Sequence, residues 1–234
     1  MKHWVYNFLV EASLKGRKKV DIVDYGCGDG FLLNFFPFKN INTYKGFDIN
    51  KNSIKTAQKR FSRFKNINFY FINRGGWRLK KENQVDVIFC IGVLQYLTKF
   101  EIKKFLAQAE RTLERNGILL ISCTANHWLY RQISPYRFFL PHSYLDRKEI
   151  IRQIEGSGFK VTYQKEKGIF FIPIFSKIVV FFFDAIDKLF FRTSGSIGLF
   201  GRTVRRLANP ILIPEYLLPI DFGETLIIKA VKSS

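Results

Sequence analysis

The sequence is poor in the residues that build metal and disulfide centres. Its 234 residues include only three cysteines and three histidines. Cys27, Cys90 and Cys123 form no Cys-x-x-Cys pair, and no cluster of histidines accompanies them. This pattern excludes a disulfide framework and gives no indication of a zinc site. It indicates a reduced, cytoplasmic setting.

Acidic residues are scarce as well. The chain has 19 Asp and Glu against 38 Lys and Arg, a formal net charge of +19. Such an excess predicts an anionic partner, which is a nucleic acid, an acidic membrane face or a phosphorylated substrate. The apolar content of 47% excludes a disordered or collagen-like chain, because it suffices for a large core.

Apolar strands alternate with amphipathic helices from residue 19 onward. A strand in 19–30 ends in a glycine-rich turn, and the last strand occupies 224–232. Further strands are predicted at 43–50, 67–73, 85–97, 118–123 and 159–165. The alternation predicts an α/β fold with a doubly wound sheet.

The helices are predicted from periodicity and end signals. A short N-terminal helix is predicted within residues 1–18. Another helix is predicted to begin in residues 31–38, where Pro37 limits its length. A basic helix starts at Ser53 as its N-cap. Another helix ends at Gly117, and a last one occupies 146–158. The domain then covers 19–234, with residues 169–222 as a helical insert or cap before the last strand.

Small and polar residues follow the predicted strands at their carboxyl ends, where open α/β sheets bind ligands. Gly26 and Gly28 let the backbone approach a ligand, and the N-terminus of the next helix offers N–H groups. Asp48 stands where a carboxylate accepts hydrogen bonds from two ribose hydroxyls. A dinucleotide fingerprint would place a third glycine where this chain has Phe31. The arrangement predicts a nucleoside-bearing cofactor.

Four ordered motifs decide which cofactor is expected: DYGCGDG, GFDIN, VDVIFCIGVLQYL and LERNGILLIS. They resemble the class I S-adenosylmethionine-dependent methyltransferases over roughly the first half of the chain. The resemblance implies a Rossmann-like, seven-stranded sheet and S-adenosylmethionine as the cofactor.

The resemblance also implies residue roles. Asp24 would support the turn and the surroundings of the cofactor's amino group, and Asp48, followed by Ile49, would hold the ribose. Asn73 would accept a hydrogen bond from the adenine amine. The backbone segments expected along the methionyl and adenine parts are Gly26, Cys27 and Gly28 after the first strand, and Cys90, Ile91 and Gly92 after the fourth.

Methyl transfer from a sulfonium needs alignment more than proton transfer. A general base is required only if the acceptor loses a proton early. The candidates are His127, His142 and Tyr96. Each has a plain structural alternative, since His142 can simply precede a helix and Tyr96 can belong to the core.

The segment 169–222 holds 10 of the 26 phenylalanines, and six basic residues accompany them. An interfacial helix facing anionic lipid and a lid packed on the domain or on a second subunit both fit this composition. A membrane-spanning helix does not fit, because charged residues interrupt the segment.

The acceptor is expected to be a small molecule or a lipid-linked compound, with the protein cytoplasmic or peripheral on the inner face of a membrane. An RNA methyltransferase and a non-catalytic cofactor-binding subunit are the alternatives. The net charge favours RNA, but Cys90–Val93 replaces the Asn/Asp-Pro-Pro-aromatic motif that methylation of base amines requires.

Overall fold

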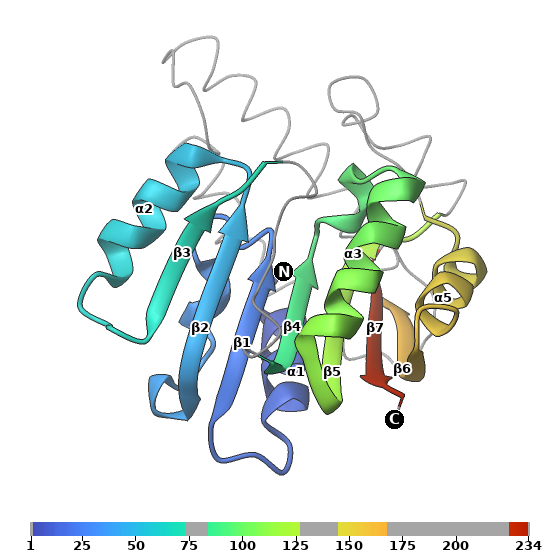
Figure 1. Cartoon of the computed structure of the whole chain (residues 1–234), viewed down its shortest axis with the longest axis horizontal. Coiled ribbons are helices and arrows are strands. Elements are labelled where there is room, and N and C mark those ends of the chain that lie inside the picture. Colours follow the sequence, from blue (N-terminus) through green and yellow to red (C-terminus); the bar gives the residue numbers. More distant parts are fainter. Residues whose placement is uncertain (1, 74–83, 127–144, 168–224, 234) are drawn as a thin grey trace, which may run out of the picture.

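Seven strands form one sheet in the order β3-β2-β1-β4-β5-β7-β6 (Figure 1). The computed structural model describes residues 2–73, 84–126, 145–167 and 225–233. The strands are β1 (Val20–Tyr25), β2 (Ile41–Asp48), β3 (Ile67–Phe71), β4 (Val85–Ile91), β5 (Leu113–Thr124), β6 (Phe159–Lys167) and β7 (Thr225–Lys232). The predicted α/β fold with a doubly wound, seven-stranded sheet is confirmed.

The first five strands in space are parallel, and β7 runs antiparallel to both β5 and β6. Their carboxyl ends therefore lie along one edge of the sheet, the upper edge in Figure 1. The register aligns Tyr25 at the end of β1 with Phe47 on β2, and Asp48 with Phe71 on β3. Segments distant in the sequence thus meet at this carboxyl edge.

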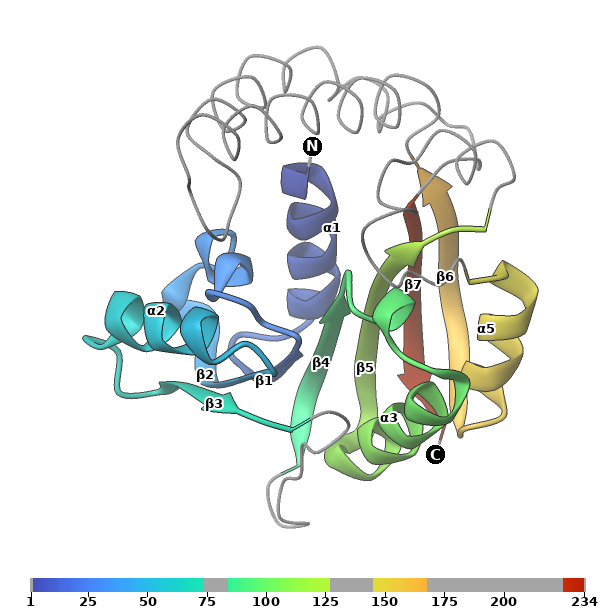
Figure 2. The ribbon, with the colours of Figure 1, turned by 90° about the horizontal axis from the view of Figure 1, so that it is seen from above.

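The helices cover both faces of the sheet (Figure 2). They are α1 (Lys2–Leu14), α2 (Lys51–Phe61), α3 (Lys99–Thr112) and α5 (Arg147–Glu155). Buried side chains of α1 and α2 join one apolar cluster, and those of α3 and α5 join another on the opposite face. Central strands contribute to both, since Ile22 and Val23 point to opposite sides. This explains why these strands are apolar throughout.

The prediction of an α-helix after the glycine turn is wrong. Residues Phe31–Asn34 and Phe38–Asn40 form two short 3₁₀ helices instead. Pro37 separates them, because proline has no N–H to donate and restricts the residue before it. The segment therefore lacks the N-terminus of a regular helix that the sequence predicted beside the turn.

Two predicted helix ends also differ from the structure. The N-cap of α2 is Asn50, not Ser53, because the Asn50 side chain accepts hydrogen bonds from the amides of Asn52 and Ser53. Helix α3 ends at Thr112 rather than at Gly117. Strand β5 starts immediately afterwards, and Gly117 lies within it. A residue at Gly117 with a side chain would meet the Glu114 carbonyl oxygen at 2.9 Å.

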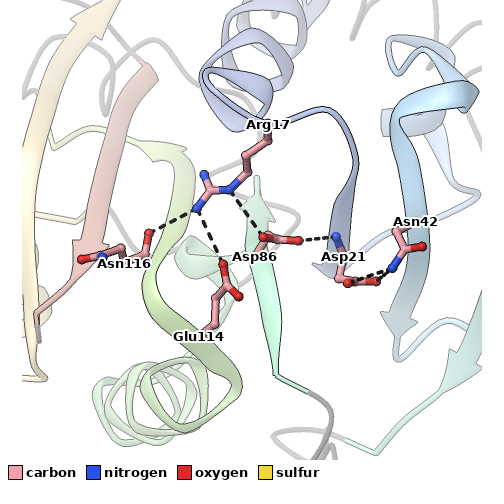
Figure 3. A network of polar contacts seen from close by, with 6 residues as sticks. All are labelled: Arg17, Asp21, Asn42, Asp86, Glu114 and Asn116. Atoms are coloured by element: carbon pink, nitrogen blue, oxygen red, sulfur yellow. Dashed lines mark hydrogen bonds and ion pairs between the residues drawn. The ribbon is translucent and has the colours of Figure 1, made fainter.

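Charged side chains join four strands at the opposite, amino edge of the sheet (Figure 3). Arg17, between α1 and β1, lies 3.4 Å from the Asp86 carboxylate on β4 and 3.9 Å from that of Glu114 on β5. Asp86 accepts a hydrogen bond from the Asp21 amide on β1 at 2.7 Å. Asn42 on β2 donates to the Asp21 carboxylate. The network fixes the strands at the edge remote from the carboxyl ends.

The insert at 169–222 lies outside the described residues, and the division of the chain at residue 18 stays a prediction. Within 2–73, 84–126, 145–167 and 225–233, no helix has both the length and the apolar character needed to span a membrane.

Candidate functional site

The turn after β1 is held tightly against β2. The amides of Gly26 and Cys27 both donate to the Phe47 carbonyl, at 2.7 and 3.1 Å. Gly26 has a φ of +79°, and a Cβ atom there would lie 2.1 Å from the Val93 side chain. Gly28 also has a positive φ, but the space beside its Cα is open. The backbone is therefore bare at Gly28, where a ligand can approach it.

Asp48 is oriented by the backbone at the end of β2. One carboxylate oxygen accepts from the Gly28 amide at 2.8 Å, and the other accepts from the Asn50 amide at 2.7 Å. A carboxylate offers about four lone-pair sites, so two remain for a ligand's hydroxyl groups. The contact also joins the glycine turn to β2, which brings together the predicted residues of the first two motifs.

Asp24 lies in the core beneath the turn and is 3% exposed. The Tyr44 hydroxyl donates to its carboxylate at 2.6 Å. Burial raises the pKa of Asp24 to about 7, the Tyr44 hydrogen bond opposes this rise, and the Asp48 charge adds to it. Asp24 therefore supports the turn from below and titrates near neutral pH.

Gln95 is a residue that the sequence reasoning missed. It follows β4 in a short 3₁₀ turn and is buried, and its side-chain nitrogen donates to the Gly92 carbonyl at 3.0 Å. That hydrogen bond identifies Nε2 and therefore also Oε1 of the Gln95 amide. The Oε1 atom has no hydrogen-bond donor among the described residues. An unpaired buried oxygen is costly unless a ligand donor reaches it. No sequence pattern indicated this role.

The three cysteine thiols belong to the core. Burial raises the pKa of Cys27 and of Cys90, and burial together with the Glu166 charge raises that of Cys123 to about 12. Few thiolates form at neutral pH under these conditions, so the structure assigns the thiols a packing role. Cys90 is fully buried, which leaves only its backbone for contact with a ligand.

The remaining predicted residues fall into two groups. Ile49, Asn73 and Tyr96 are exposed at the carboxyl edge, whereas His127 and His142 lie outside the described residues. Tyr96 is 41% exposed, so its interpretation as a core residue is wrong. Ile91 and Gly92 are half-buried at the end of β4, and the Gly92 amide donates to Ser122 on β5.

Residues 23–119, fewer than half of the chain, match the family model described as a methyltransferase domain. These residues therefore carry a methyltransferase domain. The match begins in β1 and includes the glycine turn, Asp48 and Gln95. No curated protein matches this methyltransferase in sequence.

Solved structures share its fold at low sequence identity. A candidate sarcosine dimethylglycine methyltransferase from Galdieria sulphuraria has a TM-score of 0.68 and 14% identity, over 99% of this chain and 86% of the other. The N-methyltransferase NodS from Bradyrhizobium japonicum WM9 has a TM-score of 0.61 and 13% identity, over 100% and 97%. NodS has also been solved with S-adenosyl-L-homocysteine.

A third neighbour shows that this fold serves other chemistry too. The [4+2]-cyclase SpnF has a TM-score of 0.66 and 14% identity, over 97% of this chain and 79% of its own. The fold alone therefore does not fix the reaction. For the present chain, the family model that matches residues 23–119 indicates methyl transfer.

Proposed function

We propose that this methyltransferase modifies a small-molecule or lipid-linked acceptor, at the surface of a membrane. The observation that carries the proposal is the apolar character of the carboxyl edge beside the glycine turn. Tyr96 and Phe100, just after β4, are exposed there although both are large and apolar. Exposed apolar groups beside a binding site favour an acceptor with an apolar part.

The residues that would hold the cofactor lie at the glycine turn and at the ends of β2, β3 and β4. Asp48 would accept hydrogen bonds from the ribose hydroxyls, with Ile49 beside the adenine and Asn73 at its amine. The bare backbone of Gly26, Cys27 and Gly28 would follow the methionyl part, above Asp24. The buried oxygen of Gln95 is an acceptor for a donor on that side. Cys90, Ile91 and Gly92 would contribute backbone along the same side.

The bound cofactor supplies an activated methyl group on a sulfonium. The protein's task is then to hold the acceptor atom in line with that methyl and to exclude water. Alignment of this kind is worth about 7–11 kcal/mol. Three residues are candidates for removing a proton from the acceptor. Tyr96 is exposed at the carboxyl edge, whereas His127 and His142 lie outside the described residues.

Replacement of Asp48 tests the cofactor site. We expect Asp48→Ala to weaken S-adenosylmethionine binding by about 2–4 kcal/mol, because it removes a charged, bidentate acceptor. Isothermal titration calorimetry measures the affinity. Asp29→Ala is the matched control, since Asp29 is an exposed carboxylate in the same turn whose ion pair is with Arg60. Equal affinities of the Asp48 variant and the parent would disprove the ribose assignment.

The acceptor class is tested by transfer of labelled methyl from S-adenosylmethionine into a cell extract, followed by partition. Label in the organic phase or in small aqueous metabolites is the expected result. Label in RNA would instead support the second candidate, an RNA methyltransferase. The observation that favours this alternative is the basic outer face of α2, where Lys51, Lys55 and Lys59 are exposed at intervals of four residues.

A further inference from the structure

In the part of the chain that the structure describes, most exposed large apolar side chains lie at the carboxyl edge. Among the described residues there are six of them, and five lie at or just after the carboxyl ends of β2, β3 and β4. The five are Ile49, Tyr70, Phe71, Tyr96 and Phe100, of which Phe100 is 76% exposed. The sixth, Phe38, precedes β2 at the amino edge. This distribution singles out one edge.

The five side chains belong to two sets along the carboxyl edge, here called clusters, one on either side of the glycine turn. Ile49, Tyr70 and Phe71 make up the first cluster, at the ends of β2 and β3. Tyr96 and Phe100 make up the second, between β4 and the first turn of α3. In the sheet, β1 and its turn lie between β2 and β4. A flat apolar surface that touches both clusters would therefore extend over the glycine turn.

Unpaired cations flank both clusters. Lys51 and Lys55 lie in the first turns of α2, and Lys103 lies one turn after Phe100 on α3. All three are exposed, and none has an ion pair within the described part of the chain. Residues 49–81 contain no Asp or Glu that could compensate the α2 lysines.

The carboxylates at this edge are already engaged. Asp48 accepts from two backbone amides, Glu101 takes part in the capping box of α3, and Asp146 caps α5. Glu149 pairs with Lys99 at 2.7 Å. The edge therefore combines apolar side chains with lysines that have no ion pair among the described residues.

We propose that the carboxyl edge docks on an anionic lipid bilayer, with the two apolar clusters in the interface and Lys51, Lys55 and Lys103 on the headgroups. The inference rests on the proposed function, which it extends by turning the site's opening toward the lipid. Combined apolar and cationic contact is the pattern of interfacial binding. A nucleic-acid duplex would contact the cations alone through its phosphates, whereas a single strand also stacks its bases on aromatic rings, so binding to polyuridylate is compared in the test.

The test is sedimentation of the full chain with vesicles of phosphatidylglycerol and phosphatidylcholine, compared with phosphatidylcholine alone. The double variant Lys51→Gln/Lys55→Gln should bind the anionic vesicles about 25-fold more weakly, at about fivefold per cation. The control variant Lys59→Gln/Lys65→Gln removes the same charge farther from the carboxyl edge. Its affinity for the anionic vesicles should fall much less. Phe100→Ser should weaken binding about tenfold, whereas Phe38→Ser should leave it unchanged.

Three results would overturn the proposal: no preference of the parent for anionic vesicles, equal losses in the two lysine pairs, or tighter binding to polyuridylate than to vesicles. Calorimetry with S-adenosylmethionine on each variant keeps the proposed function separate. If the parent binds S-adenosylmethionine but not the vesicles, only the proposed docking edge is rejected. If the parent does not bind S-adenosylmethionine at all, the proposed function is rejected.

Discussion

At the scale of single residues, Asp24 carries the largest consequence for pH. Folding buries this carboxyl group and raises its pKa from 3.8 to about 7. Between those values the folded chain binds more protons at this site than the unfolded chain does. The contribution of Asp24 to stability is therefore complete below about pH 4 and is lost as the pH rises through 7.

We expect Asp24→Asn to remove this pH dependence. The free energy of unfolding of the variant, minus that of the parent, should rise by about 1 kcal/mol per pH unit between pH 5 and 7. Urea titrations at several pH values measure the difference. The Tyr44 hydroxyl can still donate to an Asn oxygen, so packing is kept. A difference that is constant with pH would contradict the buried titration.

At the scale of elements, the first turn of α3 positions one side of the site. Thr98 and Glu101 form a capping box, in which the Thr98 hydroxyl accepts from the Glu101 amide and the Glu101 carboxylate accepts from the Thr98 amide at 2.8 Å. This cap starts the helix directly after Tyr96 and beside Phe100. The cap therefore supports the segment that would border the acceptor in the proposed function.

Thr98→Ala should lower the free energy of unfolding by about 1 kcal/mol, since it leaves an amide of the first turn without its acceptor. Thr98→Ser, which keeps the hydroxyl, is the matched control and should stay close to the parent. Thermal unfolding followed by circular dichroism detects the difference. Equal losses in both variants would mean that the methyl group, and not the cap, stabilises the helix start.

At the scale of the whole molecule, Arg17 connects segments that are far apart in the chain. Its guanidinium contacts Asp86 on β4 and both Glu114 and the Asn116 carbonyl on β5 (Figure 3). Partial burial is the largest cause that raises the pKa of Glu114, and the nearby Asp86 adds to the rise. The positive charge of Arg17 opposes it. Without Arg17, the two carboxylates would repel each other when ionised.

Arg17→Met should therefore destabilise the fold more at pH 8 than at pH 5, by about 1–2 kcal/mol at the higher pH. Because the pKa of Glu114 is raised, this carboxylate takes up a proton more readily as the pH falls, which relieves the repulsion. Arg115→Met is the control, because Arg115 is exposed and next to Glu114 in sequence. Denaturant unfolding at both pH values measures the effect, and a loss independent of pH would contradict this explanation.

The sequence by itself determined the strands, their alternation with helices and the four ordered motifs of a class I methyltransferase. These features are local, since apolar runs, glycines and a carboxylate after a strand are visible in neighbouring residues. Local end signals were less decisive. Ser53 and Gly117 both resemble helix ends. Asn50, however, accepts the hydrogen bonds from the first amides of α2, and residues from Leu113 onward pair with β4 as strand β5.

Only the tertiary structure decided which side chains are buried and which are exposed. It buried the three thiols, exposed Tyr96 and left the Gln95 oxygen without a donor among the described residues. It also gathered the exposed apolar groups at one edge. Burial and hydrogen-bond partners depend on segments brought together by folding, so residue type and spacing cannot determine them.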